Sequence, residues 1–376
     1  MKKVYLDNAS TTAIHPEVIQ EMARVMAENY GNPSSTHSFG RTARVTLETS
    51  RKTIASLLNA EAREIIFTSG GTEANNWIIR TAVKDLGVKR IISSKSEHHS
   101  VLHTVELVAR EYDIPVNYVK LLPDGAADLN DLAGLLKDRE PALVSLMHVN
   151  NETGAILDLE AVGRLCHENN SFFHTDTVQS IGKERFDLQN LTVDFLTASA
   201  HKFHGPKGIG FAFIRKNSPV RAMLYGGEQE KNVRAGTEAI HQIAGMAKAL
   251  QLSYENLDQN RKHISELKEY FHEQLSQAFP GFKINGTGGE ELFYNITNVL
   301  LPLPEDKTAM ILFHLDMKGI AVSRGSACQS GSIRPSHVLR EILPAEDIGK
   351  PSLRVSFSHY NTKEDIDLFI EALKSV

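Results

Sequence analysis

Between residues 60 and 215 the chain alternates short apolar runs with amphipathic segments of helical length. The apolar runs show little polar alternation, which is typical of strands that are buried on both faces. Strands that alternate with helices predict an α/β fold with a mostly parallel sheet covered by helices. The runs are 64–67, 90–92, 116–119, 142–147, 172–174, 194–196 and 210–213.

A different pattern follows from residue 238 onward. A helical periodicity runs from 238 to about 275, and we expect this long helix to bridge to a second unit. Beyond it, strands at 295–300 and 353–357 mix with helices near 306–318 and 363–374, which predicts a smaller α+β domain. A length of 376 residues also favours about two domains. We therefore predict a large α/β domain over 16–255 and a small domain built from 1–15 and 256–376.

Charge and hydropathy narrow the classes of partner. The chain has 41 Lys and Arg against 46 Asp and Glu, and it contains no long basic block, which argues against a nucleic-acid surface. The N-terminus shows no apolar signal segment, and no stretch approaches the roughly 18 apolar residues of a membrane span. We expect a cytoplasmic protein without membrane contact, with small molecules or proteins as partners.

The two cysteines lie in contrasting surroundings. Cys166 shares a helical face with Val162 and Leu165, so we expect it in the core. Cys328 lies in the small and polar tract 323–332, where a thiol is reachable and able to react. An incidental loop cysteine explains that tract equally well.

Polar residues follow the apolar runs, where ligands bind in an open α/β sheet. Residues 68–73 form a Thr-Ser-Gly-Gly-Thr-Glu turn before a helix, which is either a phosphate cup or an ordinary glycine turn capped by Thr72. His98 and His99 follow the run at 90–92, with His103 one turn further. The His99 and His103 pair lacks a third metal ligand of the usual kind, so we predict no metal site.

Lys202 follows the strand at 194–198 and has apolar and aromatic neighbours. Desolvation would lower its pKa and make it an imine-forming amine, although a solvated or phosphate-binding lysine is the alternative. A phosphate cup, a histidine, Asp176 and a lysine on successive strand ends form the set that pyridoxal phosphate requires. Arg354, inside a strand of the second unit, is suited to bind an amino-acid carboxylate, with a surface arginine as the alternative.

With these residues in place, the chain resembles the cysteine desulfurases of the NifS/IscS type, within the aminotransferase-like class of pyridoxal-phosphate enzymes. The resemblance covers essentially the whole length, and its motifs keep the family's order. They are 5–12, 31–35, 68–73, 96–98, 148–152, 176–180, 200–202, 234–237 and 325–328.

The resemblance implies the aminotransferase-like fold (fold type I) and a role for each matching residue. Lys202 holds the cofactor covalently, His98 stacks on its ring, Asp176 pairs with the ring nitrogen and Gln179 contacts the ring oxygen. The phosphate lies against Gly71, Thr72, Ser199 and His201. Thr237 reaches the phosphate of the other subunit, so a homodimer is implied. Asn151 and Arg354 contact the substrate carboxylate, and Asn151 also belongs to the cofactor site.

The activity implied is removal of sulfur from L-cysteine, giving L-alanine and a persulfide on Cys328. Lys202 removes the α-proton and His98 handles the thiol protons. The loop at 323–335 resembles the longer catalytic loop of the subgroup that serves iron–sulfur assembly and tRNA thiolation, so an acceptor protein is implied. Cys328 is also a candidate for a transient iron–sulfur ligand. Gln329 and Ser10 depart from the family's usual motifs, which puts loop motion and the acceptor in doubt, not the chemistry.

Two alternatives remain open at the level of sequence. A selenocysteine lyase, or another pyridoxal-phosphate enzyme of amino acids, would keep the cofactor and leave Cys328 idle. A protein-binding scaffold without catalysis would need neither the cofactor nor Cys328. The intact set of Lys202, Asp176 and Cys328 argues against this alternative.

Overall fold

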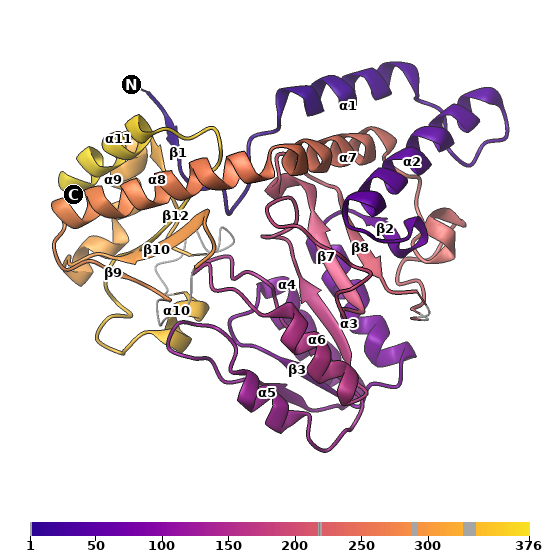
Figure 1. The fold of residues 1–376 in the computed structure, drawn as a ribbon, viewed down its shortest axis with the longest axis horizontal. Coiled ribbons are helices and arrows are strands. Elements are labelled where there is room, and N and C mark those ends of the chain that lie inside the picture. Colours follow the sequence, from indigo (N-terminus) through magenta and orange to yellow (C-terminus); the bar gives the residue numbers. More distant parts are fainter. Residues whose placement is uncertain (1, 217, 219, 287–291, 326–335) are drawn as a thin grey trace.

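The computed structural model describes residues 2–216, 218, 220–286, 292–325 and 336–376. Its largest element is a seven-stranded sheet with strand order β2-β8-β7-β6-β5-β3-β4 (Figure 1). The strands are β2 Ile65–Thr68, β3 Arg90–Ser93, β4 Val116–Tyr118, β5 Ala142–Ser145, β6 Phe172–Asp176, β7 Phe195–Ser199 and β8 Gly210–Ile214.

Five neighbouring strands, from β4 to β7, run parallel, and β8 runs antiparallel to both β7 and β2. The predicted α/β fold with a mostly parallel sheet is therefore confirmed. The reversal at β8 follows from chain length, because the ten or so residues between β7 and β8 are too few for the helical crossover that a parallel neighbour needs. This short link carries Lys202, which is thereby held at the carboxyl end of β7.

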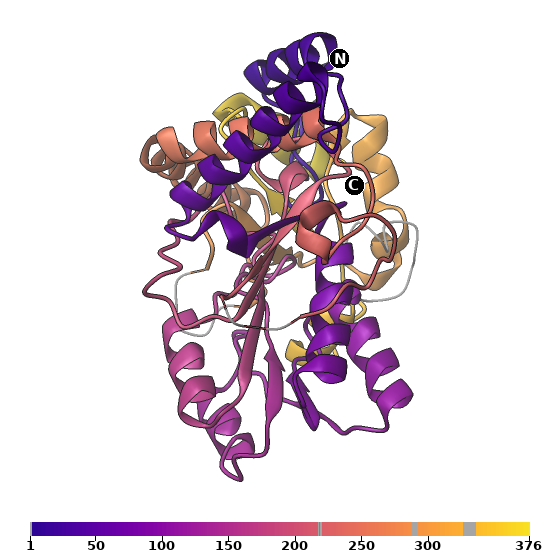
Figure 2. The same cartoon turned by 90° about the vertical axis from the view of Figure 1, so that its right-hand side faces the viewer.

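Helices cover both faces of this sheet (Figure 2). One face packs against apolar residues of α1, α2, α6 and α7, and the other against α3 and α4. Cys166 is 1% exposed in the first of these clusters, which confirms its predicted core position. The helices are α1 Pro16–Glu28, α2 Ser38–Leu57, α3 Gly71–Asp85, α4 His99–Tyr112, α5 Leu129–Leu135, α6 Leu159–Glu168 and α7 Ile240–Glu255.

The long helix expected from 238 to about 275 is two helices. α7 ends at Glu255 and α8 spans Leu257–Ala278, with Asn256 between them outside helical geometry. Figure 1 shows α8 continuing away from the large sheet toward the unit that contains both ends of the described chain.

That unit has its own apolar cluster, in which α8 packs against both chain ends. A three-stranded antiparallel sheet has the order β12-β10-β9, and β1 pairs in parallel with β11. Its elements are β1 Val4–Tyr5, β9 Lys283–Ile284, β10 Ile296–Leu300, α9 Ile311–Met317, β11 Ile320–Ala321, α10 His337–Ile342, β12 Ser352–Ser356 and α11 Lys363–Lys374. Within the described ranges, none of the helices combines the length and apolar character needed to cross a membrane.

Candidate active site

A pocket of about 370 Å³ lies where the large sheet's strand ends meet the small unit. Most of the predicted site residues line it. They are Gly71, Thr72, His98, Asn151, Asp176, Gln179, Ser199, His201, Lys202 and Arg354. Thr237 is exposed and does not line this pocket, so its role toward another subunit stays a prediction. Cys328 lies outside the described residues.

The glycine turn between β2 and α3 forms one wall of the pocket. Gly70 has φ +149°, a backbone conformation that residues with a side chain rarely adopt. A Cβ atom on Gly71 would lie 2.7 Å from Cγ2 of Val178, so no larger residue fits there without displacement. The first N–H groups of α3 have no intrahelical partner and carry the positive end of the helix dipole, which suits a phosphate.

A buried hydrogen-bond network links the two sides of the pocket. The Asn75 amide donates to Oδ2 of Asp176 at 2.8 Å and to Oγ of Ser100 at 2.9 Å, and it accepts from Oγ1 of Thr197 at 2.9 Å. Oγ of Ser100 lies 2.8 Å from Nδ1 of His98. One fully buried amide therefore fixes the carboxylate and, through Ser100, the imidazole.

His98 also caps α4, because its Nδ1 accepts the N–H of Ser100. Burial lowers the pKa of His98, the charge of Asp176 partly opposes this, and Lys202 adds to the lowering. The imidazole is therefore neutral at pH 7. Its neighbour Glu97 is fully buried, and burial raises the pKa of that carboxyl well above its usual range.

Lys202 ends the short 3₁₀ helix Ala200–Lys202 that follows β7. Its Nζ donates to the carbonyl oxygens of Ala9 at 2.5 Å and Ser10 at 2.8 Å. The N-terminal segment therefore closes one side of the pocket, although it is far from Lys202 in sequence.

Arg354 is 1% exposed on β12, so the alternative of a surface arginine is wrong. Its Nη2 donates to Oδ1 of Asp7 at 2.8 Å and to Oγ of Ser10 at 2.6 Å, and its Nη1 donates to the carbonyl of Asn151 at 2.9 Å. Nε is buried and has no acceptor within the described part of the chain. This guanidinium is held rigidly at the pocket wall, and its residue type suits a carboxylate ligand.

The histidines beyond His98 form a separate group. The rings of His99 and His103 have centroids 4.9 Å apart, and those of His99 and His337 are 4.4 Å apart. Over the ranges that the structure describes, no group of three or more His, Cys, Asp or Glu residues is arranged to hold a metal ion.

Sequence reasoning did not single out Asn75, Ser100 or the pairing of Asp7 with Arg354. Asn75 lies one helical turn after Gly71, on the helix that begins at the glycine turn. That spacing places Asn75 on the same helix face as Gly71, and it is the feature of the sequence that points to Asn75 as a pocket residue. The contact of Asp7 with Arg354 joins the two chain ends and left no local pattern to read.

The chain matches the family model described as aminotransferase class V over residues 4–369. The layered sheet, the glycine turn and the lysine after β7 are therefore those of a class V aminotransferase-like protein.

Individual relatives in sequence and in structure indicate a narrower family than class V aminotransferases. The chain is 39% identical to a cysteine desulfurase IscS of Dictyoglomus turgidum over 377 residues, which covers 100% of this chain and 94% of that protein. It superposes on a solved NifS-like protein with a TM-score of 0.91 and 34% identity, covering 100% of this chain and 99% of the other. A structure titled SspA in complex with cysteine matches with a TM-score of 0.82 and 28% identity over 96% of this chain and 100% of that one. The chain belongs to the cysteine desulfurase family of the NifS/IscS type.

Proposed function

We propose that this chain removes the sulfur atom from L-cysteine with bound pyridoxal phosphate, leaving L-alanine and a persulfide on Cys328. The observation that carries the proposal is the convergence of Asp176, His98, Lys202 and a glycine-led helix start in one pocket with the buried Arg354. The relative solved in complex with cysteine supports the choice of substrate.

The residues of the pocket fit the cofactor. The start of α3, with Ser199 and His201 beside it, would hold the phosphate, and Asp176 would hold the ring nitrogen. Oε1 of Gln179 is buried and has no hydrogen-bond partner among the residues described, which suits an acceptor for the ring hydroxyl. When bound, pyridoxal phosphate supplies an electron sink for negative charge at the substrate α-carbon.

Residues of the protein carry out substrate binding, proton transfer and sulfur transfer. Arg354 binds the substrate carboxylate beside Asn151, and Nζ of Lys202 takes the proton from the α-carbon. The Cys328 thiolate attacks the substrate sulfur, and the carbon–sulfur bond breaks with its electron pair left on carbon. The proton given up by the Cys328 thiol goes to that carbon, by way of His98, and Nζ of Lys202 returns the α-proton. L-alanine is released, and Cys328 keeps the sulfur as a persulfide.

We propose two protein partners. One is a second copy of this chain, because α1, the link from α1 to α2, α2 and the 224–225 segment present exposed apolar side chains, among them Tyr30 at 69%, Phe39 at 55% and Tyr225 at 79% exposed. Light scattering would then report twice the chain mass of 41.7 kDa, and a mass of 41.7 kDa would contradict the dimer. The other is a sulfur-acceptor protein of iron–sulfur assembly or tRNA thiolation. We expect the reaction in the cytoplasm, where reducing conditions keep thiols free.

The test is incubation of the purified protein with L-cysteine, followed by mass spectrometry of its cysteine peptides and measurement of alanine. We expect one added sulfur on the Cys328 peptide and none on the Cys166 peptide, because Cys166 is 1% exposed and burial raises the pKa of its thiol. Normal alanine formation with an unmodified Cys328 would overturn the persulfide step.

The pH dependence of kcat/KM tests the role of His98. A neutral imidazole can accept a thiol proton, and the neutral form prevails above the pKa. Because burial lowers the pKa of His98 from its ordinary value of 6.5, we expect the acid limb of the profile to lie below pH 6.5. His98→Gln should lose that limb together with most of the rate. A variant that keeps the wild-type limb would assign the titration to another group.

A further inference from the structure

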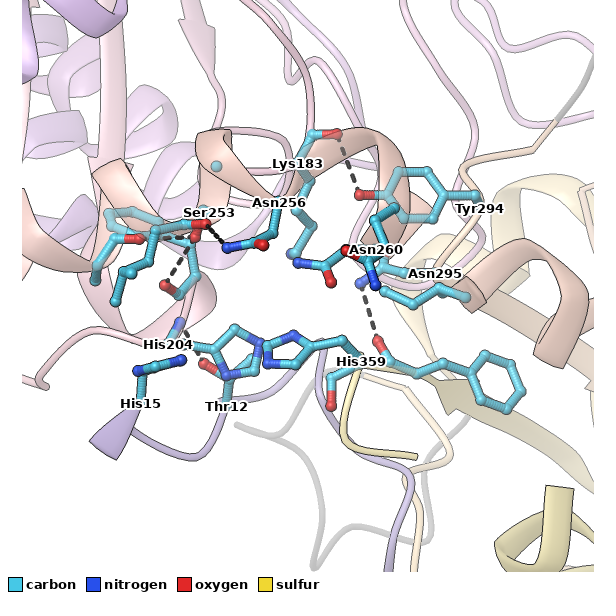
Figure 3. Close-up of a pocket in the computed structure, with 18 residues that line it drawn as sticks. Thr12, His15, Lys183, His204, Ser253, Asn256, Asn260, Tyr294, Asn295 and His359 are labelled. Atoms are coloured by element: carbon cyan, nitrogen blue, oxygen red, sulfur yellow. Dashed lines mark hydrogen bonds between the residues drawn. The ribbon is translucent and has the colours of Figure 1, made fainter. Parts of the chain in front are cut away.

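A second cavity, of about 250 Å³, lies at the junction of the two units, and none of its described lining residues lines the active-site pocket. Figure 3 shows its walls: His15, His204 and His359 lie along one side, and Lys183 and Tyr294 lie along the other. Five segments surround the one that carries Lys183. They are the chain start, the link between β7 and β8, the α7–α8 boundary, and two segments of the small unit at 294–295 and 357–359.

The described lining of this cavity is polar but contains no carboxylate. Amides and hydroxyls of Ser253, Asn256, Gln259 and Asn260 come from the α7–α8 boundary, with no aspartate or glutamate among the described lining residues. A buried cation in such surroundings has no built-in counter-charge, so a negatively charged occupant is favoured.

Lys183 is that cation. It is 8% exposed, and within the described structure its Nζ makes one hydrogen bond, donated to the carbonyl of Gln179 at 2.9 Å, and no ion pair. An ammonium group has three donors, so two remain for a ligand. Oδ1 of Asn295, which also lines the cavity, is buried without a partner among the described residues and can accept a hydrogen bond from a protonated ligand oxygen.

His204 and His359 add polarity without charge. The rings of His204 and His359 have centroids 4.5 Å apart. Nδ1 of His204 donates to the carbonyl of Ala13 at 2.8 Å. Burial lowers the pKa of His204 to about 3 and that of His359 to about 4, so both are neutral at pH 7. These two rings therefore supply no positive charge, whereas the Lys183 ammonium does.

We propose that this cavity is a binding site for a small oxyanion, held through Lys183. Phosphate-bearing and carboxylate-bearing small molecules share the chemistry that the site recognises. The site is distinct from the predicted cofactor phosphate cup, which lies in the other pocket.

The test uses the cofactor-loaded protein, so that the phosphate cup is filled, at pH 6.5 and constant ionic strength. Inorganic phosphate and, separately, acetate are titrated while the unfolding temperature is followed. We expect a saturable increase, because a ligand that binds the folded state stabilises it by mass action. If phosphate saturates at the lower concentration, the ligand bears a phosphate group. If acetate does, the ligand bears a carboxylate.

Lys183→Met should weaken the apparent affinity by about tenfold or more, as expected for loss of a charge-assisted hydrogen bond. Lys52→Met, on the exposed face of α2, is the matched control and should respond like the wild type. Asn256→Trp is a second variant, for the case that Lys183→Met does not fold. It fills the cavity from its rim and keeps Lys183, and it should show the same loss of anion affinity. Non-specific salt stabilisation is common to all variants.

Sulfate, which keeps its charge between pH 6 and 8, gives a second readout. Burial and the nearby Lys202 lower the pKa of Lys183 to about 7, and the other titratable groups coupled to it are His201 and His204. An anion binds the protonated amine, so the affinity should fall as pH rises through 7. Equal responses of wild type and Lys183→Met would mean that the cavity holds only water, and would overturn the proposal.

Discussion

Lys202→Ala should lower the turnover of L-cysteine by about 10³-fold or more, because it removes both the covalent anchor of the cofactor and the base that takes the α-proton. The substitution also removes the hydrogen bonds that Nζ donates to the carbonyls of Ala9 and Ser10. The visible absorption of the covalently attached cofactor should disappear together with the activity.

The matched control is Lys95→Ala. Lys95 is close to His98 in sequence but does not line the pocket. Its side chain is 56% exposed and makes a 3.9 Å ion pair with Glu341. Its turnover should stay within about twofold of the wild type, as is usual for surface substitutions. Wild-type turnover in Lys202→Ala would contradict the role of Lys202 as anchor and base, whereas a loss in both variants would point to unfolding.

Arg51→Met should destabilise the fold by about 3–5 kcal/mol, the usual cost when one partner of a buried ion pair is removed. Arg51 and Glu230 each have 2% of the side chain exposed and form a bidentate pair at 2.8 and 2.7 Å. Arg51 also donates to the carbonyl of Ile65, and its guanidinium lies 4.5 Å from the ring centroid of Phe67. The substitution leaves the Glu230 carboxylate buried without its cation.

The pair also positions a strained segment. Glu230, Lys231 and Asn232 are consecutive residues with φ of 44°, 58° and 68°, a conformation that costs free energy and persists where surrounding contacts hold it. Arg234, just beyond, pairs with Glu73 at 2.8 Å beside the glycine turn. Loss of the buried pair should therefore loosen the segment that leads to Thr237.

Urea unfolding measures the effect, and a double variant separates its causes. Arg51→Met with Glu230→Gln keeps an acceptor for the N–H of Phe67, which donates to Glu230 at 2.8 Å, and removes the unpaired charge. We expect it to recover part of the lost stability. Arg24→Met, which breaks the surface pairs of Arg24 with Glu21 and Glu28, should cost at most about 1 kcal/mol. A similar small cost for Arg51→Met would contradict the importance of the buried pair.

The hydrophobic pattern predicted most strands because these strands are buried on both faces and leave short apolar runs. The strand expected at 295–300 is β10 Ile296–Leu300, and the helix expected at 363–374 is α11 Lys363–Lys374. The break at Asn256 was not predicted, because the apolar periodicity continues across it while each helix packs into a different core.

The predicted site residues could be read from the sequence because parallel strands place their carboxyl ends at one edge, so residues that follow successive strands meet. Lys202, Asp176 and His98 each have such a local signal. The local signal for Asn75 was weak, because its role depends on which face of α3 is turned toward the pocket. Asp7, Ser10 and the buried state of Arg354 had none, because their contacts join the two ends of the chain.

By itself, the sequence determined the α/β class, the order of the strands along the chain and the chemistry available at their ends, because these depend on local periodicity and residue type. Tertiary structure alone decided which groups are buried and which lack partners. The second cavity depends wholly on the latter: Lys183 looks like any turn lysine in the sequence, and only the packing of five separate segments around it makes it a buried cation without a carboxylate beside it.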